Sequence, residues 1–189
     1  MKKTLVSILS VIALQSCVEE KTFPKPFGFV HIETPKPEYQ ELDTDCPYSF
    51  EYSKYAVIAA RANNDSMNCH QSLYYPMFDA TIYMSYLPLD TNLIALIGDA
   101  HNKVYEHRIK SEGIHEEYIE RFDDKVEGMI FDLDGNVALN NLFFVTDTTD
   151  HYFIGQLYFN VVPNYDSLKP AIEFIRNDIR HLTQTFDWK

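Results

Sequence analysis

Seven histidines and 28 acidic side chains supply the groups from which acid–base catalysis or a metal site could be built. His101 and His107 are six positions apart, which places them on different faces of a helix. A helical metal site uses two histidines four residues apart, on one face. We therefore do not expect these two histidines to bind one metal ion.

The stretch Asp132-Leu133-Asp134-Gly135-Asn136 superficially resembles the start of a calcium-binding loop. It lacks the third ligand before the glycine and the glutamate at the twelfth position that such a loop requires. Asp-Gly is also the strongest short signal for a two-residue hairpin turn. The stretch therefore predicts a turn between two antiparallel strands.

Asp147, Asp150 and His151 could act as acid and base, but the two aspartates belong to a predicted turn, Asp147-Thr148-Thr149-Asp150, and no nucleophile lies beside them. The chain has only six glycines, and it lacks the G-x-S-x-G, glycine-rich phosphate-loop and H-E-x-x-H patterns. We predict that the protein is not an enzyme and holds no metal or cofactor.

Cys17 follows a segment typical of export signals. Lys2 and Lys3 precede an apolar run of about ten residues, half of the roughly 20 that a membrane-spanning helix needs. The run ends in Leu14-Gln15-Ser16-Cys17, which resembles the lipobox of bacterial lipoproteins except at Gln15, where a small residue is usual. We predict a signal peptide over 1–16 and a covalent lipid, including palmitate, on Cys17. The alternative is an ordinary cleavable signal that ends near a cysteine.

Cys46 and Cys69 are the cysteines left in the mature chain. In an oxidising compartment such a pair predicts a disulfide, and closing a loop of about 24 residues stabilises the fold by roughly 3 kcal/mol. A metal site is the alternative, because His70 follows Cys69. No second close pair of ligands supplies the usual spacing, so the disulfide is favoured.

The net charge of −12 indicates a surface that repels nucleic acid and anionic lipid. Prolines 24, 26, 35, 37 and 47 predict an extended lead-in. We therefore divide the chain into a signal peptide (1–16), a lipidated N-terminus with a proline-rich lead-in (17–45) and one globular domain (46–189).

The hydrophobic pattern predicts strands over 48–60, 73–75, 80–86, 126–133, 142–146 and 152–162. Residues 114–122 fit a helix or a strand, and their β-branched and aromatic content favours a strand. One helix is expected from a cap at Asp90 or Thr91 to about Arg108. A second begins at Asp166 or Ser167, with Pro170 in its first turn, and carries an apolar stripe to Phe186. The sum is a single α+β domain, an antiparallel sheet packed against two amphipathic helices.

Thirteen tyrosines and thirteen phenylalanines are many for a core of this size, and tyrosine is common at protein interfaces. We predict a tyrosine-rich interaction surface. The alternative is a sheet whose exposed face happens to be rich in tyrosine. The candidates are Tyr39, Tyr48, Tyr52, Tyr74, Tyr75, Tyr83 and Tyr158.

An ordered set of motifs along the mature chain is similar to the gliding-motility lipoprotein GldD family of Bacteroidetes-type bacteria. The set comprises Pro24-Lys25-Pro26 with Gly28, the segment 46–52, Asn68-Cys69, Tyr75-Pro76, 143–147, 155–160 and the tail from Phe174 through Asp178-Ile179 and His181-Leu182 to Trp188-Lys189. The chain departs from the family pattern at Phe27, His70 and Ile154, where the family commonly has arginine, an aromatic residue and arginine.

This resemblance implies a lipoprotein of the cell envelope, on the outer membrane, that is required for surface gliding and linked to type IX secretion. It implies other gliding or secretion proteins as partners, a membrane reached through the lipid anchor, and no nucleic acid. The family offers no catalytic residue to carry over. A module that binds glycan or peptide through its tyrosines is the second hypothesis, and it requires a concave pocket lined by them.

Overall fold

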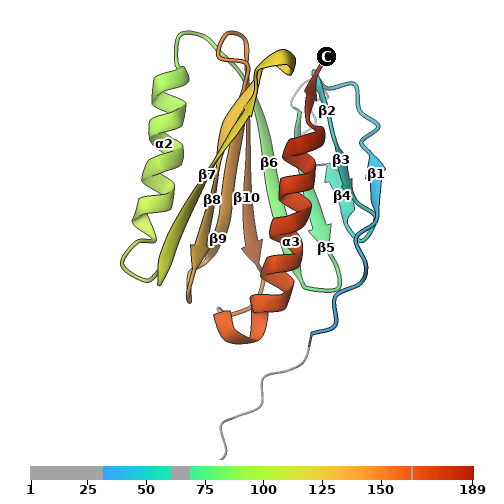
Figure 1. Cartoon of the computed structure of the whole chain (residues 1–189), viewed down its shortest axis with the longest axis vertical. Coiled ribbons are helices and arrows are strands. Elements are labelled where there is room, and N and C mark those ends of the chain that lie inside the picture. Colours follow the sequence, from blue (N-terminus) through green and yellow to red (C-terminus); the bar gives the residue numbers. More distant parts are fainter. Residues whose placement is uncertain (1–31, 61–68, 163) are drawn as a thin grey trace, which may run out of the picture.

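The computed structural model describes residues 32–60, 69–162 and 164–189. A seven-stranded antiparallel sheet forms its centre, in the order β4-β5-β6-β10-β9-β8-β7 (Figure 1). The strands are β4 (Val57–Ala60), β5 (His70–Tyr75), β6 (Ala80–Pro88), β7 (Gly113–Arg121), β8 (Val126–Asp134), β9 (Leu139–Thr146) and β10 (His151–Phe159). The predicted strands from residue 80 onward are present, including the one over 114–122.

The segment 48–60, predicted as one strand, is divided among three sheets. Its first strand, β2 (Tyr48–Ser49), pairs with the C-terminal β11 (Asp187–Trp188), and its second, β3 (Glu51–Ser53), pairs with β1 (Tyr39–Glu41). Only β4 joins the large sheet. The chain turns at 54–56 between them, where the backbone N–H of Ala56 donates to the carbonyl of Ser53, so a continuous run of aromatic and β-branched residues does not require a continuous strand.

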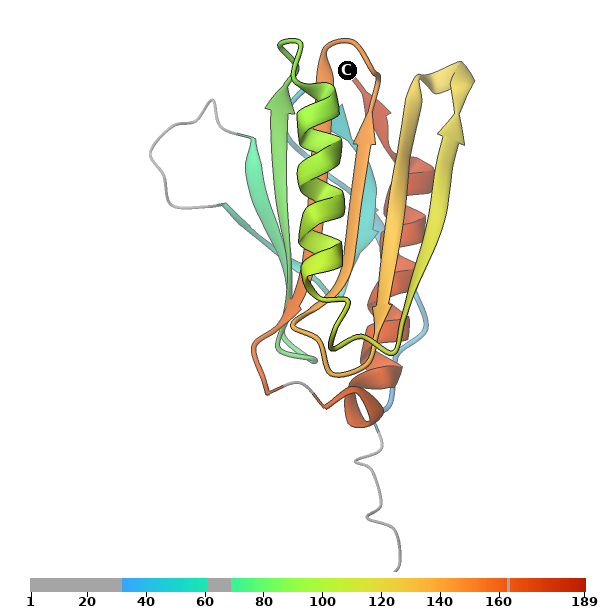
Figure 2. The same cartoon turned by 90° about the vertical axis from the view of Figure 1, so that its left-hand side faces the viewer.

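Helix α3 (Tyr165–Thr185) lies on one side of the large sheet and helix α2 (Leu93–Glu106) on the other (Figures 1 and 2). The two helices and mostly antiparallel strands of the described residues confirm the predicted α+β class. Neither described helix is long and apolar enough to cross a membrane.

Helix α3 buries Ile172, Ile175, Ile179 and Leu182 in the larger core cluster, which also holds Ile82, Met84, Phe143, Phe153 and Leu157 from the sheet. The predicted start of this helix is wrong. Asn164 is its N-cap and accepts from the backbone N–H of Ser167, so Pro170 lies in the second turn rather than the first.

Helix α2 buries only Ala100 and Val104, over Phe131, Leu142 and Phe144 of the second core cluster. Its predicted caps are also wrong, because Asn92 precedes the helix and makes no capping hydrogen bond with its side chain. The side chain of Asn92 accepts instead from the backbone N–H of Asp90, within the loop before the helix.

The predicted turns lie between the strands they were expected to join. Gly135 follows β8 with φ of +96°, a backbone conformation that favours glycine. Between β9 and β10, the carboxylate of Asp147 accepts from the backbone N–H groups of Thr149, Asp150 and His151. Burial opposes ionisation of Asp147, but these three donors hold its pKa below the usual value. Asp147 therefore closes the turn.

Candidate docking surface

Three of the seven tyrosines named from the sequence lie on one face of the large sheet, on three adjacent strands. Tyr74 of β5 is opposite Thr81 of β6, and Thr81 is opposite Tyr158 of β10. Tyr83 lies two residues beyond Thr81 on the same strand. Because paired and alternate residues of antiparallel strands share a face, Tyr74, Tyr83 and Tyr158 project together. We call these three residues the tyrosine face.

The tyrosine face is on the same side of the sheet as α2. This helix stands in front of the middle of the sheet and leaves β4 and β5 to one side of it (Figure 2). His101 packs edge-on against Phe131 of β8, with ring centroids 5.0 Å apart, and the hydroxyl of Tyr152 on β10 donates to the carbonyl of Leu96. Neither contact involves the tyrosine face, whose three side chains are half-buried.

The tyrosine face presents both aromatic ring surface and hydroxyl groups. The rings of Tyr83 and Tyr158 lie 6.0 Å apart, tilted by 59°. The hydroxyl of Tyr158 donates to Gln156, and that of Tyr74 donates to Asp79. Burial raises the pKa of Tyr158, and the neighbouring Tyr83 raises it further. The hydroxyl of Tyr158 therefore stays neutral at physiological pH. Such side chains suit a partner surface that is apolar with a few hydrogen-bonding groups.

The other four predicted tyrosines do not belong to this face. Tyr48 and Tyr75 are 0 % and 1 % exposed, so their assignment to an interaction surface is wrong. Tyr39 of β1 stacks on His181 with ring centroids 3.5 Å apart, and Tyr52 of β3 packs against the α3 core. The sequence reading placed all seven in one set because aromatic content alone does not tell which face of a strand is covered.

Val57 was missed by the sequence reading. It is opposite Tyr74, on the same face of the sheet, and is 55 % exposed. The alternation of Val57 with Ile58, which packs against the α3 core, was the signal for an outward position in β4. Val57 therefore extends the apolar part of the tyrosine face to the edge of the sheet.

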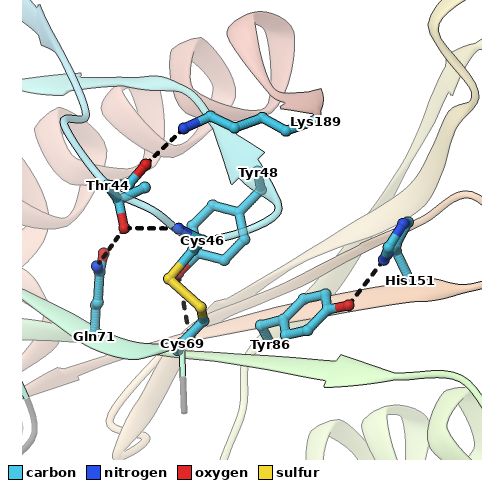
Figure 3. The surroundings of a disulfide bond; sticks show 8 residues. All are labelled: Thr44, Cys46, Tyr48, Cys69, Gln71, Tyr86, His151 and Lys189. Carbon is cyan, nitrogen blue, oxygen red and sulfur yellow. Dashed lines mark hydrogen bonds between the residues drawn. A yellow bond between two sulfur atoms is a disulfide. The ribbon is translucent and has the colours of Figure 1, made fainter. Parts of the chain in front are cut away.

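Cys46 and Cys69 form a disulfide between the end of the lead-in and the start of β5, with Cα atoms 5.7 Å apart (Figure 3). The hydroxyl of Tyr48 donates to the carbonyl of Cys69, so the polar group of this buried tyrosine has a partner. Thr44 accepts at its carbonyl from the Nζ of Lys189. The lead-in, the edge of the large sheet and the C-terminus thus meet at one point.

The acidic residues of the calcium-like stretch are engaged with helix α3. Arg176, 4 % exposed, donates from Nη1 to Asp134 at 2.9 Å, and its Nε lies 3.0 Å from a carboxylate oxygen of Asp132. The Nη2 of Arg176 also donates to the carbonyls of Leu133 and Asn140. The two aspartates therefore neutralise a buried guanidinium, a role that residues more than 40 positions apart do not reveal in sequence.

Asp178 is the buried acidic group with the most unusual surroundings. It is 2 % exposed and accepts a hydrogen bond from the hydroxyl of Tyr75. Its other carboxylate oxygen and the hydroxyl oxygen of Ser53 have no hydrogen-bond partner among the described atoms. Burial raises the pKa of Asp178 above its ordinary value, although the hydroxyls of Tyr39 and Tyr75 act in the opposite direction. Ser53 and Tyr75 are equally buried, so this cluster lies inside the core beneath α3.

No three His, Cys, Asp or Glu side chains of the described residues come together in an arrangement that could hold a metal ion. Asp147 lies in the β9–β10 turn, and His151 is the first residue of β10, with its Nδ1 2.8 Å from the hydroxyl of Tyr86 (Figure 3). Cys17 and Phe27 lie outside the described residues.

The comparisons with known proteins concern nearly the whole chain. The family model described as "Gliding motility lipoprotein GldD" matches residues 19–188. No curated protein matches significantly. Among solved structures, the solution structure of cyanobacterial PsbP (CyanoP) from Synechocystis sp. PCC 6803 is similar, with a TM-score of 0.47 and 11% sequence identity over 82% of this chain and 95% of that one.

Proposed function

Because the chain belongs to the family of gliding motility lipoproteins GldD, we propose that it is an envelope-anchored, non-enzymatic structural or assembly component of the gliding apparatus. In this proposal, the lipid on Cys17 holds the domain at the outer membrane. The domain contacts other envelope proteins of gliding and type IX secretion.

The family match over residues 19–188 carries the proposal. The geometry supports a non-enzymatic role in two ways. The acidic groups Asp132 and Asp134 are engaged by Arg176, and the cluster around Asp178 is buried where a substrate has no access. The tyrosine face is the half-buried aromatic surface that a partner protein could cover.

Replacing Cys17 by alanine is expected to release the protein from the membrane and to abolish gliding. Two or more acyl chains anchor a protein stably, and without them the chain has only its body to hold it at the membrane. The test uses a strain that lacks the gene, complemented with the natural protein or with Cys17→Ala, scored for colony spreading, adhesin secretion and membrane fractionation.

The natural protein serves as the control and must restore both spreading and secretion. If the strain without the gene spreads normally, the proposed role in gliding is wrong. If Cys17→Ala stays in the membrane fraction, the proposed anchor is wrong, whatever the effect on spreading. If spreading is lost but secretion is normal, the proposed link to type IX secretion fails alone.

Removing the tyrosine face is expected to abolish gliding while leaving the protein at the membrane. Tyrosines at the centre of an interface each contribute about 2 kcal/mol or more to binding, so losing two weakens a complex by roughly three orders of magnitude. The double variant Tyr83→Ala with Tyr158→Ala is introduced into the same strain, and spreading, membrane-bound protein level and thermal melting are measured.

Tyr118→Ala is the matched control, because Tyr118 is 69 % exposed on the edge strand β7 and lies outside the tyrosine face. Full spreading by the double variant would rule out this face as the docking surface. Loss of spreading by both variants would show that the face has no special role.

A ligand-binding module for glycan or peptide is the second candidate function, and the ring surfaces of Tyr74, Tyr83 and Tyr158 favour it. Titration of the purified protein with envelope glycan fragments and with peptides distinguishes the two. Binding that Tyr83→Ala removes would favour the ligand-binding module.

A further inference from the structure

Four exposed aliphatic side chains lie in loops at one end of the large sheet. Met77 follows β5 and is 55 % exposed, Ile109 follows α2 and is 97 % exposed, and Val161 and Val162 follow β10 at 42 % and 87 %. We call this the loop end. Each of these side chains keeps a large apolar surface that the domain itself does not cover.

Strand register places these loops together. Ala80, at the start of β6, is opposite both Tyr75 at the end of β5 and Phe159 at the end of β10. The loop after β10 also contacts the loop after β5, because the backbone N–H of Asn160 donates to the carbonyl of Asp79.

The loop after α2 belongs to the same end. Glu112, the last residue before β7, donates its backbone N–H to the carbonyl of Asp134 at the end of β8. The backbone N–H of Tyr165 donates to the side chain of Asn136, so the start of α3 also lies here. The loop end is therefore a continuous boundary of the domain, seen at the bottom of Figure 1.

The lead-in enters the domain at the loop end. Tyr39, the first residue of β1, is opposite Ser53, and Glu38 accepts from the backbone N–H of Lys54 in the turn before β4. Val57, just after this turn, is opposite Tyr74 near the end of β5. The described chain begins beside the start of α3 (Figure 1).

The distance from the lipid to the domain is bounded by chain length. Fourteen residues separate Cys17 from Ile32, the first described residue. At about 3.3–3.6 Å per residue they span at most ~50 Å, and shorter separations are available to any less extended chain. The tether thus permits direct contact between the loop end and the bilayer.

The charges at the loop end favour a lipid interface over a strongly charged partner. Arg108 and Lys110 flank Ile109, Glu112 lies in the same loop after α2, and Asp79 lies in the loop after β5. Both signs are present, whereas the whole chain carries a net charge of −12. Basic side chains beside an exposed aliphatic residue can extend towards headgroups while the aliphatic part inserts.

We propose that the loop end rests on the bilayer, with Met77, Ile109, Val161 and Val162 inserted among the headgroups of the membrane that holds Cys17. This inference rests on the proposed lipid anchor. In this orientation the strands stand upright on the membrane surface. The tyrosine face then points sideways, towards neighbouring envelope proteins.

The test places a tryptophan at each end of the domain. Ile109→Trp lies at the loop end, and Phe122→Trp is the matched control at the opposite end of β7, where Phe122 is 68 % exposed. Both variants keep the natural Trp188. Each lipidated full chain is purified from membranes and reconstituted into vesicles of brominated phosphatidylcholine, which quenches tryptophan only on close contact.

Quenching of the added fluorescence is expected to be at least ~2-fold stronger for Ile109→Trp than for Phe122→Trp, and unchanged by salt because apolar contact is not screened. Circular dichroism checks that both variants are folded. Equal quenching of the two variants, or no quenching at residue 109, would overturn the proposed orientation but not the lipid anchor. A dimer that covers the loop end would give no quenching at residue 109. Absence of the protein from membranes would instead refute the anchor itself.

Discussion

Replacing Arg176 by methionine is expected to lower the free energy of unfolding by about 3–5 kcal/mol, because Asp132 and Asp134 lose the guanidinium they share and the carbonyls of Leu133 and Asn140 lose their donor. Asp132 is 6 % exposed, and with Arg176 absent its remaining partners are Asn141 and Arg180. Asp134 would keep the hydroxyl of Tyr165 but no guanidinium. Urea denaturation of the purified protein measures the loss.

Arg180→Met is the matched control for Arg176→Met. The side chain of Arg180 is 30 % exposed, and it pairs with the exposed Glu117 as well as with Asp132. Removing it leaves Arg176 beside Asp132, so we expect a loss of about 1 kcal/mol or less. If the two variants lose the same free energy of unfolding, the burial of Arg176 is not the reason for its contribution to stability.

A second substitution tests the cause of the loss. Asp132→Asn in the Arg176→Met background removes the buried charge that has only Arg180 left as its counter-charge, and it should recover part of the stability. A further loss would show that Asp132 contributes through its hydrogen bonds rather than its charge.

The Arg176 network marks a limit of reasoning from sequence. The strands between residues 80 and 159 were predicted from local runs of β-branched and aromatic residues, and two of the turns between them have a local signal, at Gly135 and at Asp147. Arg176 looks like one of the polar positions on an amphipathic helix. Its burial depends on the β8 end lying beneath α3, which no local pattern specifies.

The tyrosines show the same limit. Tyr74, Tyr83 and Tyr158 could be assigned to strands, yet which face of each strand stays open depends on where α2 lies. Tyr48 and Tyr75 were misassigned because both rings pack inside the larger core cluster, where their hydroxyls donate to Cys69 and Asp178, 21 and 103 positions away. Residue type indicates what a tyrosine can do, and the tertiary structure decides whether a partner can reach it.

Removing the Cys46–Cys69 disulfide is expected to lower the free energy of unfolding by about 3 kcal/mol, since the bond closes a loop with a sequence separation of 23. The change is Cys46→Ala together with Cys69→Ala. Replacing both cysteines avoids a lone thiol that could form a disulfide between two molecules. Urea denaturation measures the loss, and reduction of the natural protein should reproduce it.

The loss should also be local, because the bond holds the lead-in, β5 and the C-terminus together. Lys189 reaches back to Thr44 and Pro47, and β11 pairs with β2, so these contacts depend on the position of the 44–48 segment. Hydrogen exchange is expected to quicken around β2 and β11 in the double variant and to stay unchanged in β8 and β9. Uniform loss of protection would mean that the disulfide stabilises the fold only globally. A local loss would show that it fixes the junction between the 44–48 segment, β5 and the C-terminus.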